Sequence, residues 1–367
     1  MTSSSLEPIR TELAQCCARI DREVTIMEVC GTHTMSIFRN GIRTLLPPNL
    51  RLISGPGCPV CVTAQRHIDA AIDIAALPGV IVATYGDMVR VPGRRGSLES
   101  RRANGADVRV VYSIHDALKL AAGEHERTIV FLGVGFETTA PATAAAIREA
   151  YARRIDNFCV LPAHKWVVPA MLALLETRDV PIDGFLCPGH VSVIIGAQAY
   201  QPIVERHHRP CVVAGFEPGQ ILQGLLSLVA QFERGGSAVD NVYEAAVKDE
   251  GNPTALMLLD EVFEVSSAVW RGMGVIPQSG MEIRPKYAHF DALKRFEITL
   301  DVDEDPAGCL CGQVIQGKVM PQECRLFGED CTPLRPIGPC MVSSEGTCAA
   351  WFKYGRPGTR RASKPPT

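Results

Sequence analysis

The chain has 367 residues, of which 46% are hydrophobic and 21% charged, and its net charge is −3. These values are typical of an ordinary soluble protein of two or three domains, and they indicate no broad basic surface for nucleic acid. They also exclude an obvious membrane segment, because no apolar run reaches the roughly 18 residues that a span needs.

Fourteen cysteines stand out against this ordinary composition. Small secreted proteins use many cysteines for disulfides, but a chain of this length can bury a core without them. Residues 1–22 are polar and charged, and they lack the apolar stretch of a secretory signal. We therefore predict a cytoplasmic protein whose cysteines serve metal binding or catalysis.

Between residues 24 and 232 one pattern recurs, in which a short apolar run ends in a loop with glycine or proline and a helical stretch often follows. This alternation predicts parallel sheets that are covered by helices on both faces. The predicted strands are Thr25–Val29, Leu50–Ile53, Val80–Thr84, Val108–Tyr112, Thr128–Leu132, Phe158–Leu161, Phe185–Cys187 and Pro210–Ala214. The predicted helices are 63–76, 142–153, 168–176 and 221–232.

A polar stretch near residue 125 separates these strands into two sets of four, which predicts α/β domains at residues 20–125 and 126–236. Residues 237–355 form a third predicted domain, helical over 238–270, loop-rich over 272–285 and rich in cysteine thereafter. Residues 1–8 and 356–367 are predicted to be disordered tails. The expected fold class is therefore α/β, with two parallel-sheet domains and a C-terminal cysteine-rich domain that binds an iron–sulfur cluster.

The iron–sulfur prediction comes from six cysteines, at positions 309, 311, 324, 331, 340 and 348. A Cys₄ zinc ribbon would show two C-x-x-C pairs, whereas iron–sulfur clusters accept irregular spacing because each iron needs only one thiolate. Four ligands leave two thiols for a neighbouring dithiol. Zinc binding and unligated thiols are the alternatives.

Two further thiol motifs lie near the start of the chain. Cys58-Pro-Val-Cys61 is a C-x-x-C motif that opens a predicted helix, where the helix dipole favours a thiolate. It predicts a redox dithiol, with metal ligation or two structural cysteines as alternatives. Cys30 follows the first strand and precedes Gly-Thr-His33, and an imidazole near the thiol would activate it. A lone cysteine after a strand is nevertheless more often buried in the core.

Ligand sites of parallel α/β sheets lie at the carboxyl ends of strands, and both N-terminal thiol motifs fall there. The same position holds four polar side chains that are weak candidates individually and that we predict to share a pocket. These are Asp87, Glu137, His164 and His190.

Read together, six motifs resemble the HypD family of [NiFe]-hydrogenase maturation proteins. They are Glu28-Val-Cys-Gly-Thr-His-Thr34, Gly55-Pro-Gly-Cys-Pro-Val-Cys61, Tyr85-Gly-Asp-Met-Val-Arg-Val-Pro92, Gly135-Phe-Glu-Thr-Thr139, Pro188-Gly-His-Val-Ser192 and Gly338-Pro-Cys-Met-Val-Ser-Ser-Glu-Gly-Thr-Cys348. The resemblance implies three α/β domains with a [4Fe–4S] cluster in the last. It also implies a complex with a small HypC-type chaperone. That complex carries an iron while two cyanides and one carbon monoxide are attached to the iron. A HypE-type partner would supply the cyanide.

Carried over by motif, the resemblance implies that Cys30 binds this iron. From its chemistry, His33 is a candidate proton donor or orienter at the iron. Cys58 and Cys61 would be the redox dithiol. The implied cluster ligands are Cys309, Cys324, Cys331 and Cys348, which leaves Cys311 and Cys340 as a redox pair near the cluster. The expected function is an assembly scaffold with redox capability, monomeric when alone. The alternatives are a stand-alone iron–sulfur-dependent thiol–disulfide reductase, in which Cys30 is incidental, and a purely structural iron–sulfur protein.

Overall fold

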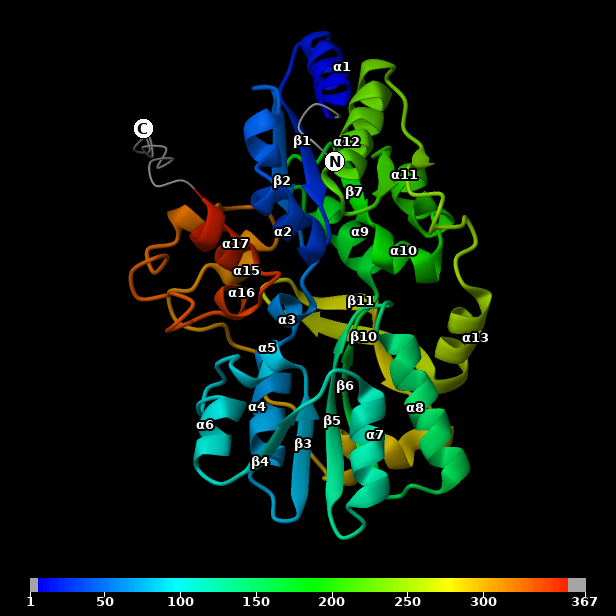
Figure 1. The fold of residues 1–367 in the computed structure, drawn as a ribbon, viewed down its shortest axis with the longest axis vertical. Helices are drawn as coiled ribbons and strands as arrows, with labels where there is room; N and C mark the ends of the chain where they lie inside the picture. The colour runs from blue at the N-terminus through cyan, green and yellow to red at the C-terminus, as the bar shows by residue number, and fades with distance from the viewer. Residues whose placement is uncertain (1–5, 356–367) are drawn as a thin grey trace.

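The computed structural model describes residues 6–355 and contains a five-stranded sheet and a four-stranded sheet, both entirely parallel (Figure 1). The strand order of the five-stranded sheet is β2 (Leu50–Ser54), β1 (Val24–Glu28), β7 (Gly184–Pro188), β8 (Cys211–Ala214) and β9 (Val239–Asn241). That of the four-stranded sheet is β4 (Asp107–Val110), β3 (Val80–Thr84), β5 (Thr128–Gly135) and β6 (Phe158–His164). The α/β class with parallel sheets is thus confirmed, and the near-continuous apolar strands are buried because helices cover both faces.

The two sheets do not follow the predicted division near residue 125. The chain builds β1 and β2, crosses to the other sheet for β3 to β6, and then returns to place β7 beside β1. Grouping the strands into consecutive sets of four was therefore wrong. Each parallel connection is a long crossover, and the apolar pattern of a strand does not say beside which earlier strand the crossover returns it.

Helices connect and cover these strands, and several coincide with predicted ones. They are α1 (Glu7–Ala18), α2 (Gly31–Arg39), α3 (Pro59–Val62), α4 (Gln65–Ile74), α5 (Gly86–Val89), α6 (Leu98–Ala103), α7 (Ile114–Gly123), α8 (Ala140–Arg153), α9 (Val167–Thr177), α10 (Gly189–Ile195), α11 (Gln201–His207), α12 (Pro218–Glu233), α13 (Pro253–Val262), α14 (Ala292–Arg295), α15 (Cys311–Val314), α16 (Pro339–Val342) and α17 (Thr347–Tyr354). Short 3₁₀ segments are η2 (Ile42–Leu45), η3 (Gln198–Tyr200), η4 (Pro285–Phe290) and η5 (Pro321–Glu323). No helix within residues 6–355 is both long and apolar enough to cross a membrane.

The predicted N-terminal tail is partly ordered, because Glu7 and Pro8 begin α1 and proline is favoured in the first turn of a helix. Residues 1–5 and 356–367, which make up the rest of the predicted tails, lie outside the described residues.

Between the two sheets lies an antiparallel hairpin of β10 (Phe263–Trp270) and β11 (Gly274–Ile283) (Figure 1). The sequence predicts a helix over 238–270 and a loop-rich stretch over 272–285 instead, and this prediction is wrong, because only α13 in that stretch is helical. The hairpin is held by tertiary contacts, because Trp270 is fully buried, stacks on Phe136 and donates from Nε1 to Ser279. Backbone bonds also tie it to the end of β6, where the Trp166 N–H donates to the Ser279 carbonyl.

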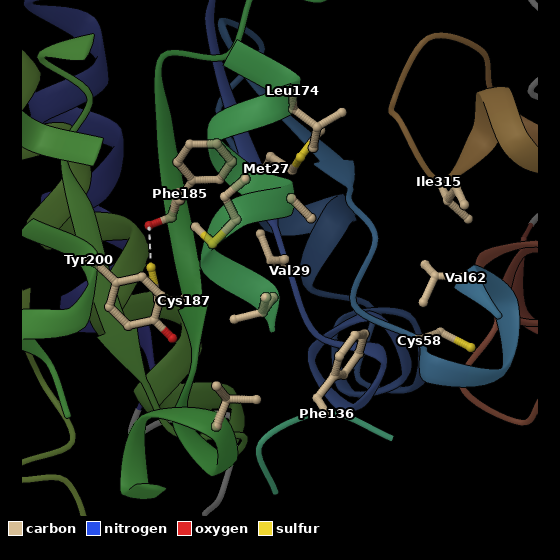
Figure 2. Packing of buried hydrophobic residues seen from close by; sticks show 14 of the residues in the cluster. Met27, Val29, Cys58, Val62, Phe136, Leu174, Phe185, Cys187, Tyr200 and Ile315 are labelled. Atoms are coloured by element: carbon tan, nitrogen blue, oxygen red, sulfur yellow. Dashed lines mark hydrogen bonds between the residues drawn. The ribbon is translucent and has the colours of Figure 1, made fainter. Parts of the chain in front are cut away.

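The C-terminal cysteine-rich segment lies beside α2 and α3, with α17 packed on α2 and α16 packed on α3 (Figure 1). One buried apolar cluster joins it to the five-stranded sheet. Figure 2 shows this cluster running from Phe185 and Met27 through Phe136 to Cys58 and Ile315. Cys311 and Cys340 belong to the same cluster, so these two thiols share a core with Cys58 and Cys61.

The central strand of the five-stranded sheet offers a test of this core. We expect Phe185→Ala to lower the free energy of unfolding by about 3–5 kcal/mol, because it empties a site that is fully buried in β7. Tyr112→Ala is the matched control, since that ring is 96% exposed, and it should change stability by less than about 0.5 kcal/mol. Urea unfolding followed by circular dichroism measures both, and equal losses would contradict the assignment of the core.

Candidate functional site

Cys30 lies at the carboxyl edge of the five-stranded sheet, as the N-cap residue of α2. Parallel pairing of β1 with β2 sets Glu28 opposite Ser54, so the loops that follow the two strands leave the sheet together. The Gly31 N–H donates to the Gly57 carbonyl at 3.1 Å. A Cβ on Gly57 would lie 2.2 Å from the Cys30 nitrogen, so only glycine permits this approach. The Cys30 loop and the C-x-x-C loop are therefore in direct contact.

The C-x-x-C motif forms a single helical turn, α3, that is separate from the longer α4. Cys58 is the N-cap residue, and its sulfur accepts the Cys61 N–H at 3.2 Å. The two cysteines form a disulfide and both are buried. The predicted dithiol motif thus lies at a helix N-terminus, but the helix is one turn long, so its dipole is smaller than the sequence suggested.

A buried carboxylate lies directly beneath Cys30. Glu28 accepts the Cys30 N–H at 3.2 Å and the Thr34 hydroxyl at 2.6 Å. Burial raises the pKa of Glu28 to about 7, although hydrogen bonds from Ser54, Thr34 and the Cys30 N–H lower it. Burial likewise raises the pKa of the Cys30 thiol to about 12. In the absence of a metal this thiol is therefore protonated, and a bound cation would have to displace its proton.

His33, one turn into α2, is buried in an aromatic group with Phe216 and His190. Its Nε2 lies 3.0 Å from the Gly215 carbonyl, and its buried Nδ1 has no hydrogen-bond partner within residues 6–355. Burial lowers the pKa of His33 to about 4, so the ring is neutral near pH 7. His190 stacks on Phe216 with ring centroids 3.9 Å apart, and its own ring is exposed.

The loop between α16 and α17 covers the same edge. Thr32 donates to Glu345 at 2.7 Å, and a Cβ on Gly31 would lie 2.5 Å from the Glu345 Cβ. On the other side, the Ser344 N–H and hydroxyl donate to Asp87 at 3.0 and 3.2 Å. Ser344 and Glu345 have no role predicted from the sequence, although both lie inside the Gly338–Cys348 motif. This loop connects the carboxyl edges of both sheets.

All six C-terminal cysteines line one pocket, together with apolar residues such as Phe327 and Met341. Backbone N–H groups donate to three of these sulfurs, from Cys311 to Cys309 at 3.4 Å, from Ile337 to Cys331 at 3.3 Å and from Cys348 to Cys340 at 3.1 Å. None of the described residues that line the pocket is a histidine or carries a carboxylate. Sulfur ligands in an apolar setting are the donor set that iron–sulfur clusters use, so the residues fit such a group.

The thiols do not converge on one point: within residues 6–355 no group of three or more His, Cys, Asp or Glu side chains is placed to hold a metal ion. A cluster differs from a single ion in this respect, because each of its irons takes its own thiolate. Four of the thiols form a row in hydrogen-bonding contact, in the order Cys309, Cys311, Cys340 and Cys348. The hydrogen bond with Cys311, and then burial, raise the pKa of Cys309.

The four weaker candidates do not share one pocket. Asp87 accepts from Ser344, and His190 lies near His33 on Phe216. Glu137 and His164 follow β5 and end β6 in the four-stranded sheet. There the Glu137 carboxylate accepts the Val167 N–H that begins α9, at 2.9 Å. His164 Nε2 lies 3.3 Å from the Thr143 hydroxyl.

Fold and site together define a two-sheet α/β protein with a cysteine-lined pocket beside two N-terminal thiol motifs. The family model described as "Hydrogenase formation hypA family", under the name HypD, matches residues 4–355. The hydrogenase maturation factor HypD of Escherichia coli is 47% identical over 95% of this chain and 94% of its own length. The factor of the same name from Cupriavidus necator is 46% identical over 92% of each chain. A putative hydrogenase expression/formation protein of Methanocaldococcus jannaschii is 44% identical over 92% of this chain and 94% of its own. The chain belongs to the HypD family.

Glu137 and His164, at the carboxyl edge of the four-stranded sheet, should each make the folding stability depend on pH. The two dependences have opposite signs. Burial raises the pKa of Glu137 from 4.5 to about 7, so its contribution to folding stability falls as the pH rises through that range. Burial lowers the pKa of His164 from 6.5 to about 3, so its contribution falls as the pH drops below 6.5. Glu137→Gln should therefore gain stability relative to wild type between pH 5 and pH 8, by at most about 3 kcal/mol.

His164→Gln is the matched variant. Its stability relative to wild type should rise in the opposite direction, as the pH falls from 8 to 5. Urea midpoints at the two pH values measure both differences. Slopes of the same sign would contradict the assigned protonation states.

Proposed function

We propose that this chain is a hydrogenase maturation factor that serves as a cytoplasmic scaffold on which the Fe(CN)₂CO group is assembled. Membership of the HypD family supports the role in maturation. The observation that carries the scaffold proposal is the contact of three thiol motifs at one sheet edge, where the C-x-x-C loop touches Cys30 and the Glu345 loop covers Gly31. The proposed partners are a small HypC-type chaperone and a HypE-type cyanide donor, with the chain a monomer when alone.

In this proposal Cys30 holds the iron that is being modified. A thiolate is a soft ligand and suits low-spin iron that carries cyanide and carbon monoxide. Glu28 orients the Cys30 backbone from below through the bond to its N–H. His33 would take up a proton at Nδ1 and then pass it on at the iron, because its ring is neutral, its Nε2 lies against the Gly215 carbonyl and its buried Nδ1 has no partner among the described residues.

The redox part of the proposal assigns electron exchange to Cys58 and Cys61. Their disulfide lies in the same buried cluster as Cys311 and Cys340, and α16, which carries Cys340, packs on α3. Cys309, Cys324, Cys331 and Cys348 would hold a [4Fe–4S] cluster, which supplies electrons singly when it is bound. Cys311 and Cys340 are neighbours in the row of thiols and would form the redox pair beside it.

The alternative is a stand-alone thiol–disulfide reductase, which the Cys58–Cys61 disulfide favours. Infrared spectroscopy separates the two functions. The scaffold, purified anaerobically with its chaperone, should show bands for iron-bound cyanide and carbon monoxide. The reductase should show neither band and should reduce a disulfide substrate without the chaperone.

The ligand assignment predicts the outcome of removing single cysteines. Protein isolated without oxygen should be brown and hold about four irons and four sulfides. Cys324→Ala or Cys331→Ala should remove most of the visible absorbance, because each removes one ligand. Cys159→Ala, a buried cysteine in β6, is the control and should retain the cluster. Stoichiometric zinc without iron in native protein would refute the assignment.

Separate roles for Cys30 and the C-x-x-C motif predict separate infrared results in the chaperone complex. Cys30→Ala should abolish retention of the iron that bears cyanide and carbon monoxide, while the cluster stays intact. Cys58→Ala or Cys61→Ala should also keep the cluster but block completion of the diatomic ligands. Normal bands in the Cys30→Ala complex would show that the iron is held elsewhere.

A further inference from the structure

Arg271 is a fully buried guanidinium that lies between the two thiol regions. The buried basic side chains of residues 6–355 are Arg271 and Lys165. Arg271 directly follows β10, which ends at Trp270, and begins the turn of the hairpin. Its backbone N–H donates to the Val62 carbonyl at 3.0 Å, and its Nε donates to the Thr63 carbonyl at 3.0 Å. Both carbonyls belong to the end of the C-x-x-C helix α3.

The same turn touches the C-terminal thiols. A Cβ on Gly272 would lie 2.3 Å from the Gly312 Cα, so the backbone next to Arg271 is packed against the backbone next to Cys311. Gln316 fixes this approach, because its amide donates to the carbonyls of both glycines at 2.7 Å. Arg271 is thus joined to α3 on one side and to α15 on the other.

The charge of Arg271 is only partly compensated. Among residues 6–355 its anionic partner is Asp305, at 3.4 Å from Nη1, and the Asp305 side chain is 34% exposed. That distance is longer than the roughly 2.7–2.9 Å of a strong charge-assisted hydrogen bond. Nη2 has no partner among the described residues, and the remaining contact of Nη1 is the neutral amide of Gln65. A buried cation of this kind needs further negative charge nearby.

The cysteine-lined pocket lies next to this turn, because Gly312, which packs on Gly272, directly follows Cys311 in α15. Asp305, the anionic partner of Arg271, approaches the same glycine, since a Cβ on Gly312 would lie 3.1 Å from the Asp305 Oδ2. A cluster held by thiolates in this pocket would supply negative charge close to the guanidinium.

We infer that Arg271 supplies the buried positive charge that stabilises the reduced, more anionic state of the C-terminal cysteine site. The inference rests on the proposed function, because it assumes that the pocket holds an iron–sulfur cluster. On reduction the site gains one electron and one unit of negative charge, and no bond forms or breaks. Arg271 acts through its charge, so it is a positioning residue for the electron and does not react.

The test is a redox titration of the anaerobic full-length protein with dithionite, followed by visible absorbance and electron paramagnetic resonance. Arg271→Met keeps the bulk and removes the charge, and we expect the equilibrium constant for reduction to fall about tenfold, which is a 59 mV lower potential for one electron. Asp305→Asn removes the opposing negative charge and should raise the potential. If the ion pair had only a structural role, both substitutions would disrupt it, and the reduction potentials of both variants would shift in the same direction.

Two further variants serve as controls. Arg271→Lys keeps the charge and should hold the potential near the wild-type value. Lys165→Met removes the other buried cation, whose Nζ donates to the Val269 carbonyl, and should leave the potential unchanged. The titration is run at pH 6, because burial lowers the pKa of Lys165 to about 7 and this side chain must be charged for the comparison.

Unshifted potentials in Arg271→Met and Asp305→Asn, or shifts of the same sign, would overturn the inference and leave the proposed cluster intact. A wild-type protein without iron would instead overturn the proposed function, and the inference with it. If Arg271→Met does not fold, Arg271→Gln, which keeps a polar group for the Thr63 carbonyl, takes its place: a lower potential supports the role of Arg271, and an equal or higher one refutes it.

Discussion

Parallel pairing of β1 with β2 is the constraint on which the candidate site depends. Because Glu28 pairs with Ser54, both strands end at one edge, and the loops that carry Cys30 and Cys58 meet there. Gly57 makes the contact possible, since any side chain would enter the space of the Cys30 backbone. The C-terminal segment then packs on the first helical turns of both loops, which brings cysteines from opposite ends of the chain into one core.

Polar contacts add to the apolar cluster in holding this assembly together. Arg43 lies over the rings of Phe38 and Trp351, at 5.0 and 5.1 Å, and so fastens α17 to α2. The Glu345 loop adds a hydrogen bond to Thr32, and Arg271 joins the hairpin turn to α3. Cys348 near the start of α17 and Cys30 before α2 are therefore set by the same pair of helices. A substitution at one thiol motif should change the structure at the other, because the elements between them are tightly packed.

The sequence predicted individual strands and helices better than it predicted which of them lie side by side. The residues of β3 were predicted without error, since an apolar, β-branched run identifies a buried strand. The crossover that returns β7 to β1 leaves no local signal, and β11 was missed because Gly274, Pro277 and Gly280 are typical of loops. The thiol motifs were visible as spacings. Thr32 and Glu345 are 313 residues apart, and Arg271 belongs to no motif, so only the fold reveals their contacts.

The central claim is that Cys30 and the C-terminal cysteines form two iron sites served by the C-x-x-C dithiol between them. Anomalous diffraction at the iron edge, from anaerobic crystals of the chaperone complex, tests it most directly. The account predicts one strong iron signal among Cys309, Cys324, Cys331 and Cys348 and a second beside Cys30. Iron bound by Cys58 and Cys61, or a C-terminal pocket that contains zinc or no metal, would contradict it.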